Sequence, residues 1–287
     1  VKKGKDVGQS EEEGTTSTNQ IMLEDEDDIP VSILLSRFVP LLLKMLDASI
    51  EENVNGARSE TSNVKLADVR KHISPELCLL HTIITTTNDT NTIIDWVLNN
   101  GLNVMMKVLS SLNNSFNNTT SNDSILLSNI QMAATCTTLL LNVGVSNNNS
   151  RLKQLHKEEE ERTFIDSSTG CASALGGLLT KLMSSSLSEE SLSEESSSEI
   201  GKENGTISTT TSTIMKACVD MATFTNKYQY TEILRPAICN EGCLPLLHEA
   251  LSVPKIANDA EKVLHTLCVR NDGPREGEAD ERVLTIM

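Results

Sequence analysis

The residue types that could form a metal site are scattered along this 287-residue chain. Among its seven cysteines, the most compact arrangement is Cys239-x3-Cys243 followed by His248. A structural zinc site needs four ligands at close spacing, and this arrangement is incomplete. An odd cysteine count without compact spacing also argues against a disulfide framework. We therefore interpret most cysteines as small apolar packing residues and expect no metal and no cofactor.

Two acidic runs offer oxygen ligands for hard cations such as calcium. They are Asp25–Asp28 and Glu158–Glu161. A calcium loop alternates its ligands and places a glycine at a fixed point, and neither run does so. Solvated charge is the interpretation that these runs favour.

Signatures of catalysis and of nucleotide binding are missing from the sequence. Gly176-Gly177 lacks the Lys and Ser/Thr of a phosphate-binding loop, and no nucleophile elbow, His-Glu-x-x-His pair or kinase signature occurs. His81 and His265 lie in similar sequence contexts, which favours packing or surface roles. We expect no enzymatic activity.

The composition limits the classes of partner that the chain is expected to bind. The net charge of −16 and the aromatic content of 2% disfavour nucleic acid, which needs clustered cations and stacking platforms. No apolar run of about 18 residues predicts a membrane span, and the first residues lack an apolar signal region. We expect a soluble intracellular protein, cytoplasmic or nuclear.

The clearest structural pattern lies near the C-terminal end of the sequence. It predicts helices at Thr231–Asn240, Leu244–Val253 and Asn258–Val269, separated by Gly242 and Pro254. This order of short helix, glycine, Leu-Pro-x-Leu helix and longer helix resembles one armadillo repeat. Such a unit buries its apolar faces only by stacking on others.

Parts of this unit recur upstream. Val39-Pro40-Leu41-Leu42 resembles Leu244-Pro245-Leu246-Leu247, with proline at a predicted helix start. Leu80-His81-Thr82-Ile83 resembles Leu264-His265-Thr266-Leu267, in a helix that Ser74 and Pro75 are predicted to begin.

The middle of the chain supplies two more predicted units. One combines Thr92–Asn99, Leu102–Leu112 and Ser128–Val143. The other combines Arg151–Ile165, Ala172–Met183 and Thr213–Thr225, with Gly170 between its first two helices.

We therefore predict an all-α fold, a right-handed α-solenoid of about four three-helix units; an irregular helical domain is the alternative. The predicted domain spans 29–270, with units near 29–87, 92–144, 151–225 and 231–270. A disordered acidic segment at 1–28 precedes it and a polar tail at 271–287 follows it.

Three units are lengthened at the same junction, between their second and third helices. These insertions are 48–73, 113–124 and 184–212, and a shared insertion point is typical of stacked repeats. They are of low complexity, and Ser186–Glu199 is too polar to offset its ordering entropy, so we expect disorder there. Lys44, Lys107 and Lys181 recur on the second helices, and we interpret them as exposed and solubilising.

The armadillo resemblance implies that the third helices line a concave groove for an extended partner. Family members that bind basic peptides carry Trp-x-x-x-Asn there. The matching pairs here are Cys78/Thr82, Thr138/Asn142, Asp220/Phe224 and Lys262/Thr266, and only Asn142 keeps that pattern. The candidate partner-binding residues are Asn142, Asp220, Phe224, Lys262 and Thr266.

These observations favour a non-catalytic scaffold or adaptor that binds a protein or peptide. The alternatives are a hydrolase or transferase on a helical scaffold, and a chaperone cofactor. Ser186, Ser191 and Ser196 each precede a glutamate by three residues, which makes them candidate phosphorylation sites where a phosphate would add charge to an acidic loop.

The insertion at 184–212 should be cut by a protease before the segment Thr213–Val269, because a disordered segment reaches the protease without unfolding. Limited proteolysis followed by mass spectrometry of the fragments measures the order of cleavage. First cuts inside the last predicted unit would contradict the unit boundaries.

Overall fold

The computed structural model describes residues 31–56, 62–86, 90–116, 123–145, 158–192, 203–223 and 230–268. Every regular element in these ranges is an α-helix, which confirms the all-α prediction for this part of the chain. The helices are α1 (Val31–Gly56), α2 (Ser62–Thr86), α3 (Thr90–Leu98), α4 (Gly101–Phe116), α5 (Ser124–Val145), α6 (Glu158–Leu192), α7 (Glu203–Thr223), α8 (Tyr230–Cys239), α9 (Cys243–Ala250) and α10 (Ala257–Cys268).

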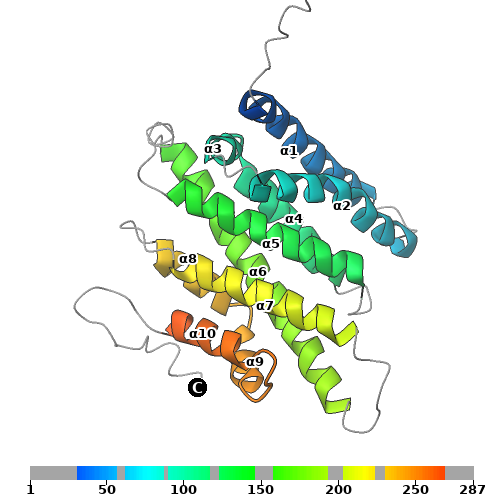
Figure 1. Ribbon diagram of the computed structural model, residues 1–287, viewed down its shortest axis with the longest axis vertical. Coiled ribbons are helices and arrows are strands. Elements are labelled where there is room, and N and C mark those ends of the chain that lie inside the picture. Colours follow the sequence, from blue (N-terminus) through cyan, green and yellow to red (C-terminus); the bar gives the residue numbers. More distant parts are fainter. Residues whose placement is uncertain are drawn as a thin grey trace, which may run out of the picture.

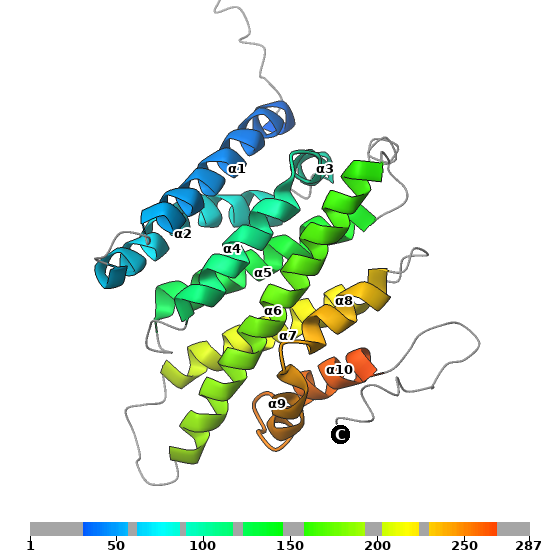
Figure 2. The same cartoon turned by 180° about the vertical axis from the view of Figure 1, so that it is seen from behind.

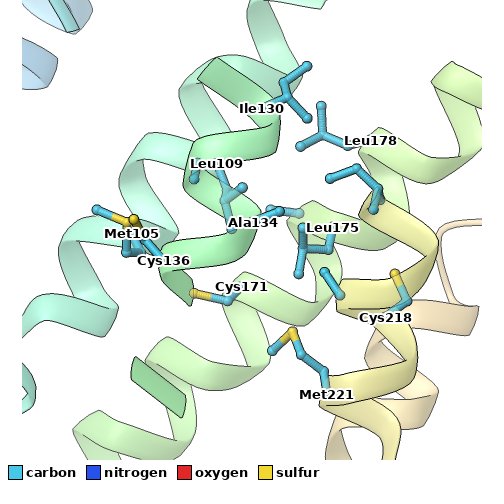
Figure 3. Close-up of a cluster of buried hydrophobic side chains, with 14 of the residues drawn as sticks. Met105, Leu109, Ile130, Ala134, Cys136, Cys171, Leu175, Leu178, Cys218 and Met221 are labelled. Carbon is cyan, nitrogen blue, oxygen red and sulfur yellow. The ribbon is translucent and has the colours of Figure 1, made fainter. Parts of the chain in front are cut away.

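Apolar residues spaced by three and four place one stripe of each helix in a shared core. In α4, Met105, Leu109 and Leu112 are buried while Ser110 is exposed. Figure 3 shows the central part of this core, where aliphatic, methionine and cysteine side chains from α4, α5, α6 and α7 meet. Burial of this apolar surface is the main force that holds the helices together.

The helices form two layers, which Figures 1 and 2 show from opposite sides. One layer contains α2, α5, α7 and α10, and these helices contact one another in that order. The other contains α1, α3, α4, α6, α8 and α9. The layers touch where α1 meets α2, α4 meets α5, α6 meets α7 and α9 meets α10. The face of the α2–α5–α7–α10 layer that points away from the second layer is called the front face below.

Glycines bring α6 unusually close to its neighbours. A Cβ atom at Gly176 would lie 2.6 Å from the backbone oxygen of Ile238, at the end of α8. A Cβ atom at Gly177 would lie 2.8 Å from the side-chain amide nitrogen of Asn113, on α4. The turn after α8 completes the contact, because Thr180 donates a hydrogen bond to the backbone oxygen of Glu241 at 3.0 Å.

Two of the three recurring lysines connect α4 and α6 to an earlier helix of their layer. Lys107 on α4 pairs with Asp47 at 2.6 Å and with Glu51 at 3.5 Å, both on α1. Lys181 on α6 donates to the backbone oxygen of Asn113 on α4 at 2.7 Å. The prediction of exposed, solubilising lysines is therefore wrong for these two, which are half-buried, and correct for Lys44, which is exposed.

The last three helices lie close to their predicted ranges. Each of α8, α9 and α10 begins one residue before its predicted start. Gly242 separates α8 from α9 with φ of 76°, a left-handed conformation that favours glycine. The backbone conformation at this turn therefore explains why glycine occupies position 242.

Helix boundaries predicted from Pro40, Pro75 and Gly170 are wrong. Both prolines lie inside helices, Pro40 in α1 and Pro75 in α2. Helix α6 runs without a break through Gly170, where two separate helices were predicted. A proline inside a helix costs about 3 kcal/mol, and buried neighbours such as Val39 and Leu77 offset this cost by packing in the core.

The predicted insertions are partly helical. Helix α1 continues to Gly56 and α2 begins at Ser62, inside the predicted insertion 48–73, and α4 runs into 113–124 as far as Phe116. Within 184–212, α6 continues to Leu192 and α7 begins at Glu203, so disorder is a wrong prediction for 186–192.

Serine hydroxyls help α6 to continue into this polar segment. Ser184 and Ser186 donate to backbone oxygens one turn earlier, at 2.8 and 2.9 Å, and Leu187 packs on the core. The segments 1–28 and 271–287 lie outside the described residues, as do 57–61, 117–122 and 193–202.

One described helix is long and apolar enough to cross a membrane by length and composition alone. It is the part of α5 from Ser124 to Val143, and 56% of that window is buried inside the fold. The sequence predicted no such span. Core helices pass the same test, so this observation assigns no location to the protein.

Gly176→Ala should destabilise the protein relative to Gly170→Ala. Both changes add the same helix propensity, but the methyl at 176 meets backbone, whereas at 170 it meets Sδ and Cγ of the flexible Met106 side chain, which can change rotamer. Forced overpacking costs about 1–3 kcal/mol, so the two variants should differ by that amount in urea unfolding followed by far-UV circular dichroism. Equal stabilities would contradict the close approach of α6 to α8.

Candidate functional site

An open groove lies on the front face, between α5 and α7. Its volume is about 590 Å³, within the range of about 300–1,000 Å³ that is usual for ligand sites. Helix α5 contributes Thr135, Thr138 and Leu139 to its lining, and the turn before α10 contributes Lys255. The residues from α7 are Ser208, Thr209, Ser212, Thr213, Lys216, Ala217 and Asp220.

Hydroxyl groups dominate the polar surface of this groove, and several of them have already used their proton. Thr135 donates to the backbone oxygen of Gln131 at 3.0 Å, and Thr138 to that of Thr135 at 3.0 Å. On the opposite wall Thr213 donates to the backbone oxygen of Thr209 at 2.9 Å. The oxygen lone pairs stay available, so the walls present acceptors to a ligand's donor groups.

The charged groups of the groove lie on its α7 side. Lys216 and Asp220 are one turn apart on α7, and Lys255 is exposed beside them. Burial raises the pKa of the Asp220 carboxyl, and the positive charge of Lys216 partly opposes that rise. A half-buried carboxylate between hydroxyl-rich walls is a strong acceptor for a backbone N–H or a cationic side chain.

The groove is connected to α10 through Asp259. Ser212 donates a short hydrogen bond to the Asp259 carboxylate, and Lys262 approaches the other oxygen of that carboxylate at 3.5 Å. A polar contact at the edge of the groove therefore joins α10 to α7.

The structure brings some of the predicted partner-binding residues together. Asp220 lines the groove, and Asn142 is exposed on α5 one turn beyond the groove residue Thr138. Lys262 is exposed on α10 and joined to the groove through Asp259. Thr266 is half-buried, and its hydroxyl donates to the backbone oxygen of Lys262 at 2.7 Å. Phe224 lies outside the described residues.

Sequence reasoning missed the part of the groove formed by Ser208–Ser212 and Lys255. The first segment was assigned to an insertion, although it belongs to α7. A signal was present, because Thr209, Thr213, Lys216 and Asp220 follow the helical spacing of four, three and four and so lie on one face. Lys255 lies in an irregular turn, for which spacing gives no signal.

Cys243 belongs to the most compact cysteine arrangement in the sequence. Cys243 is buried and donates weakly to the backbone oxygen of Ile238 at 3.5 Å, and burial raises its pKa to about 12. A buried thiol with a raised pKa is a poor nucleophile at neutral pH. The described residues contain no group of three or more His, Cys, Asp or Glu side chains that could hold a metal ion.

The histidines and acidic runs have ordinary structural positions. Burial lowers the pKa of the half-buried His81, and His265 is exposed on α10. The acidic run Glu158–Glu161 begins α6, while Asp25–Asp28 lies outside the described residues.

The candidate phosphorylation sites differ in their surroundings. Ser186 is half-buried in α6, and its oxygen lies 3.4 Å from the hydroxyl oxygen of Thr211 on α7. A phosphate there would disrupt the α6–α7 contact, whereas the sequence predicted an unstructured loop. Ser191 lies in the last turn of α6, and Ser196 is outside the described residues.

No family model matches the chain, and neither the curated proteins nor the solved structures contain a match. The class that the described structure defines is an all-α protein built from two layers of helices, with a hydroxyl-lined groove on one layer.

Asp220→Asn should increase stability at neutral pH. The ordinary pKa of the carboxyl is 3.8, and burial raises it in the folded state. The folded state therefore holds this proton more tightly, and the resulting stability is lost as the pH rises through the raised pKa. Asparagine removes that loss, so the gain in urea unfolding should be larger at pH 7 than at about pH 4.

Glu261→Gln, which removes an exposed carboxylate from α10, is the control for the change in net charge. The same pH-dependent gain in this control would show that net charge, and not the burial of Asp220, is the cause.

Proposed function

We propose that the chain is an armadillo-like solenoid that acts as a non-catalytic scaffold and holds an extended segment of a partner protein along its front face. The observation that carries this proposal is the groove between α5 and α7, which lies on the layer of predicted third helices. The order of helix contacts within that layer, α2 to α5 to α7 to α10, supports a stack of units.

The chemistry of the groove suits an extended peptide. A peptide in that conformation presents backbone N–H donors at regular intervals, and the groove offers hydroxyl oxygens and the Asp220 carboxylate as acceptors. Lys216 and Lys255 supply donors for backbone carbonyls or acidic side chains of the same peptide. A hydroxyl whose proton is already bonded to its own helix keeps that hydrogen bond when water leaves the groove. This lowers the desolvation cost of docking.

Blocking the groove should weaken peptide binding. Thr209 is exposed on the groove wall, so Thr209→Trp should fill the space without entering the core. Peptides selected from a random display library on the full-length chain serve as the probe. Their affinity for Thr209→Trp should fall at least tenfold, which corresponds to about 1.4 kcal/mol.

Ser110→Trp is the matched control, because Ser110 is exposed on α4 in the other layer. It adds the same side chain away from the groove and should leave affinity unchanged. Equal affinities of both variants and the parent chain would move the binding site off the groove. Loss of binding in both would indicate a nonspecific effect of tryptophan, and would also contradict the proposal.

A further inference from the structure

Helix α1 exposes an apolar stripe at the end of the stack. Phe38 is 43% exposed, Leu41 55% and Met45 51%. Their spacing of three and four puts them on one side of the helix. The opposite edge of α1 holds Asp47, which pairs with Lys107 of α4, so the stripe points away from the rest of the stack.

The equivalent positions on α4 and α6, two later helices of this layer, are buried. When Lys44 is aligned in sequence with Lys107 and Lys181, the three stripe residues correspond to three residues of α4 and three of α6. These residues are Gly101, Val104 and Val108 on α4 and Leu175, Leu178 and Leu182 on α6, all of them buried. The stripe therefore has the composition of an interface between neighbouring units.

The recurring lysine independently indicates that the stripe side of α1 lacks a neighbouring helix among the described residues. Lys107 and Lys181 each bond to an earlier helix of their layer, α1 and α4 respectively. Lys44 is exposed, and no such helix precedes α1 within the described residues. Helix α2 adds Leu79, which is 41% exposed, whereas its counterpart Val263 in the Leu-His-Thr match is fully buried.

We propose that residues 21–28 of this chain bind the exposed edge of α1. Ile21-Met22-Leu23 supplies the apolar side chains, and the five acidic residues from Glu24 to Asp28 supply partners for Arg37 and Lys44, both of which are exposed on α1. The acidic run takes the part that Asp47 and Glu51 play toward Lys107.

Chain length allows this contact. Leu23 lies eight positions before Val31, a distance of up to about 26 Å when the chain is extended. Leu41 lies ten residues into α1, about 15 Å along its axis. Covalent attachment also gives the segment an effective concentration on the order of millimolar, which no separate copy of a chain with a net charge of −16 reaches easily.

Disulfide trapping in the full-length chain tests the proposal. Met22→Cys is combined with Met45→Cys, in a background where the exposed Cys78 is replaced by serine. The control pair combines Met22→Cys with Thr85→Cys, because Thr85 is exposed on α2 away from the stripe. In a glutathione redox buffer, the effective concentration within the 22–45 pair should exceed that of the control pair at least tenfold.

Equal values for the two pairs would overturn the proposal. So would disulfide-linked dimers formed by Met45→Cys alone, because a second copy would then occupy the edge. Lys44→Glu should lower the 22–45 value several-fold, and Lys44→Arg should leave it unchanged. A Lys44→Glu variant that traps as well as its parent would remove the acidic segment as the occupant.

Discussion

The close approach of α6 to the helices on both sides is the constraint on which the rest of the structure depends. Packed helix axes are normally 8–10 Å apart, and a side chain at Gly176 would collide with the backbone at the end of α8. On its other side α6 meets α4 through Gly170 and Gly177. These contacts set the spacing of one layer, and the helices of the second layer pack on it.

The groove follows from that spacing. Helices α5 and α7 pack on α4 and α6. The distance between α4 and α6 therefore governs how far apart α5 and α7 can lie. Apart from Leu139, their facing surfaces carry mostly threonine and serine in place of large apolar side chains, and small polar side chains leave space between the two helices.

Sequence periodicity predicted the helical fold and the last three helices. In those helices the apolar stripes and Gly242 are local patterns that agree with the tertiary packing. The prediction failed at Pro40, Pro75 and Gly170, which were interpreted as helix boundaries. The sequence alone does not distinguish a glycine that ends a helix from a glycine that lets a neighbouring helix pack closely. The difference lies in the neighbour, here Met106 of α4, and spacing along the chain does not reveal it.

The candidate site was predicted in part. Asp220 was identified through the family pattern and does line the groove, and Asn142 follows Thr138 by one turn. The contribution of Ser208–Ser212 was missed because a polar, low-complexity stretch can also form a helix when its hydroxyls bond to the helix's own backbone, as Thr210 and Thr211 do. Composition alone does not distinguish that outcome from disorder.

The order of contacts between the helices has a consequence for folding kinetics. Helices with extensive contact lie within three places of each other in chain order, as α2 and α5, α5 and α7, and α7 and α10 do. Such local connectivity gives a low contact order, which favours rapid folding. It also lets one end of the molecule open while the other stays closed. Amide hydrogen exchange in this protein should therefore follow a gradient from the terminal helices toward α6, and not one global opening.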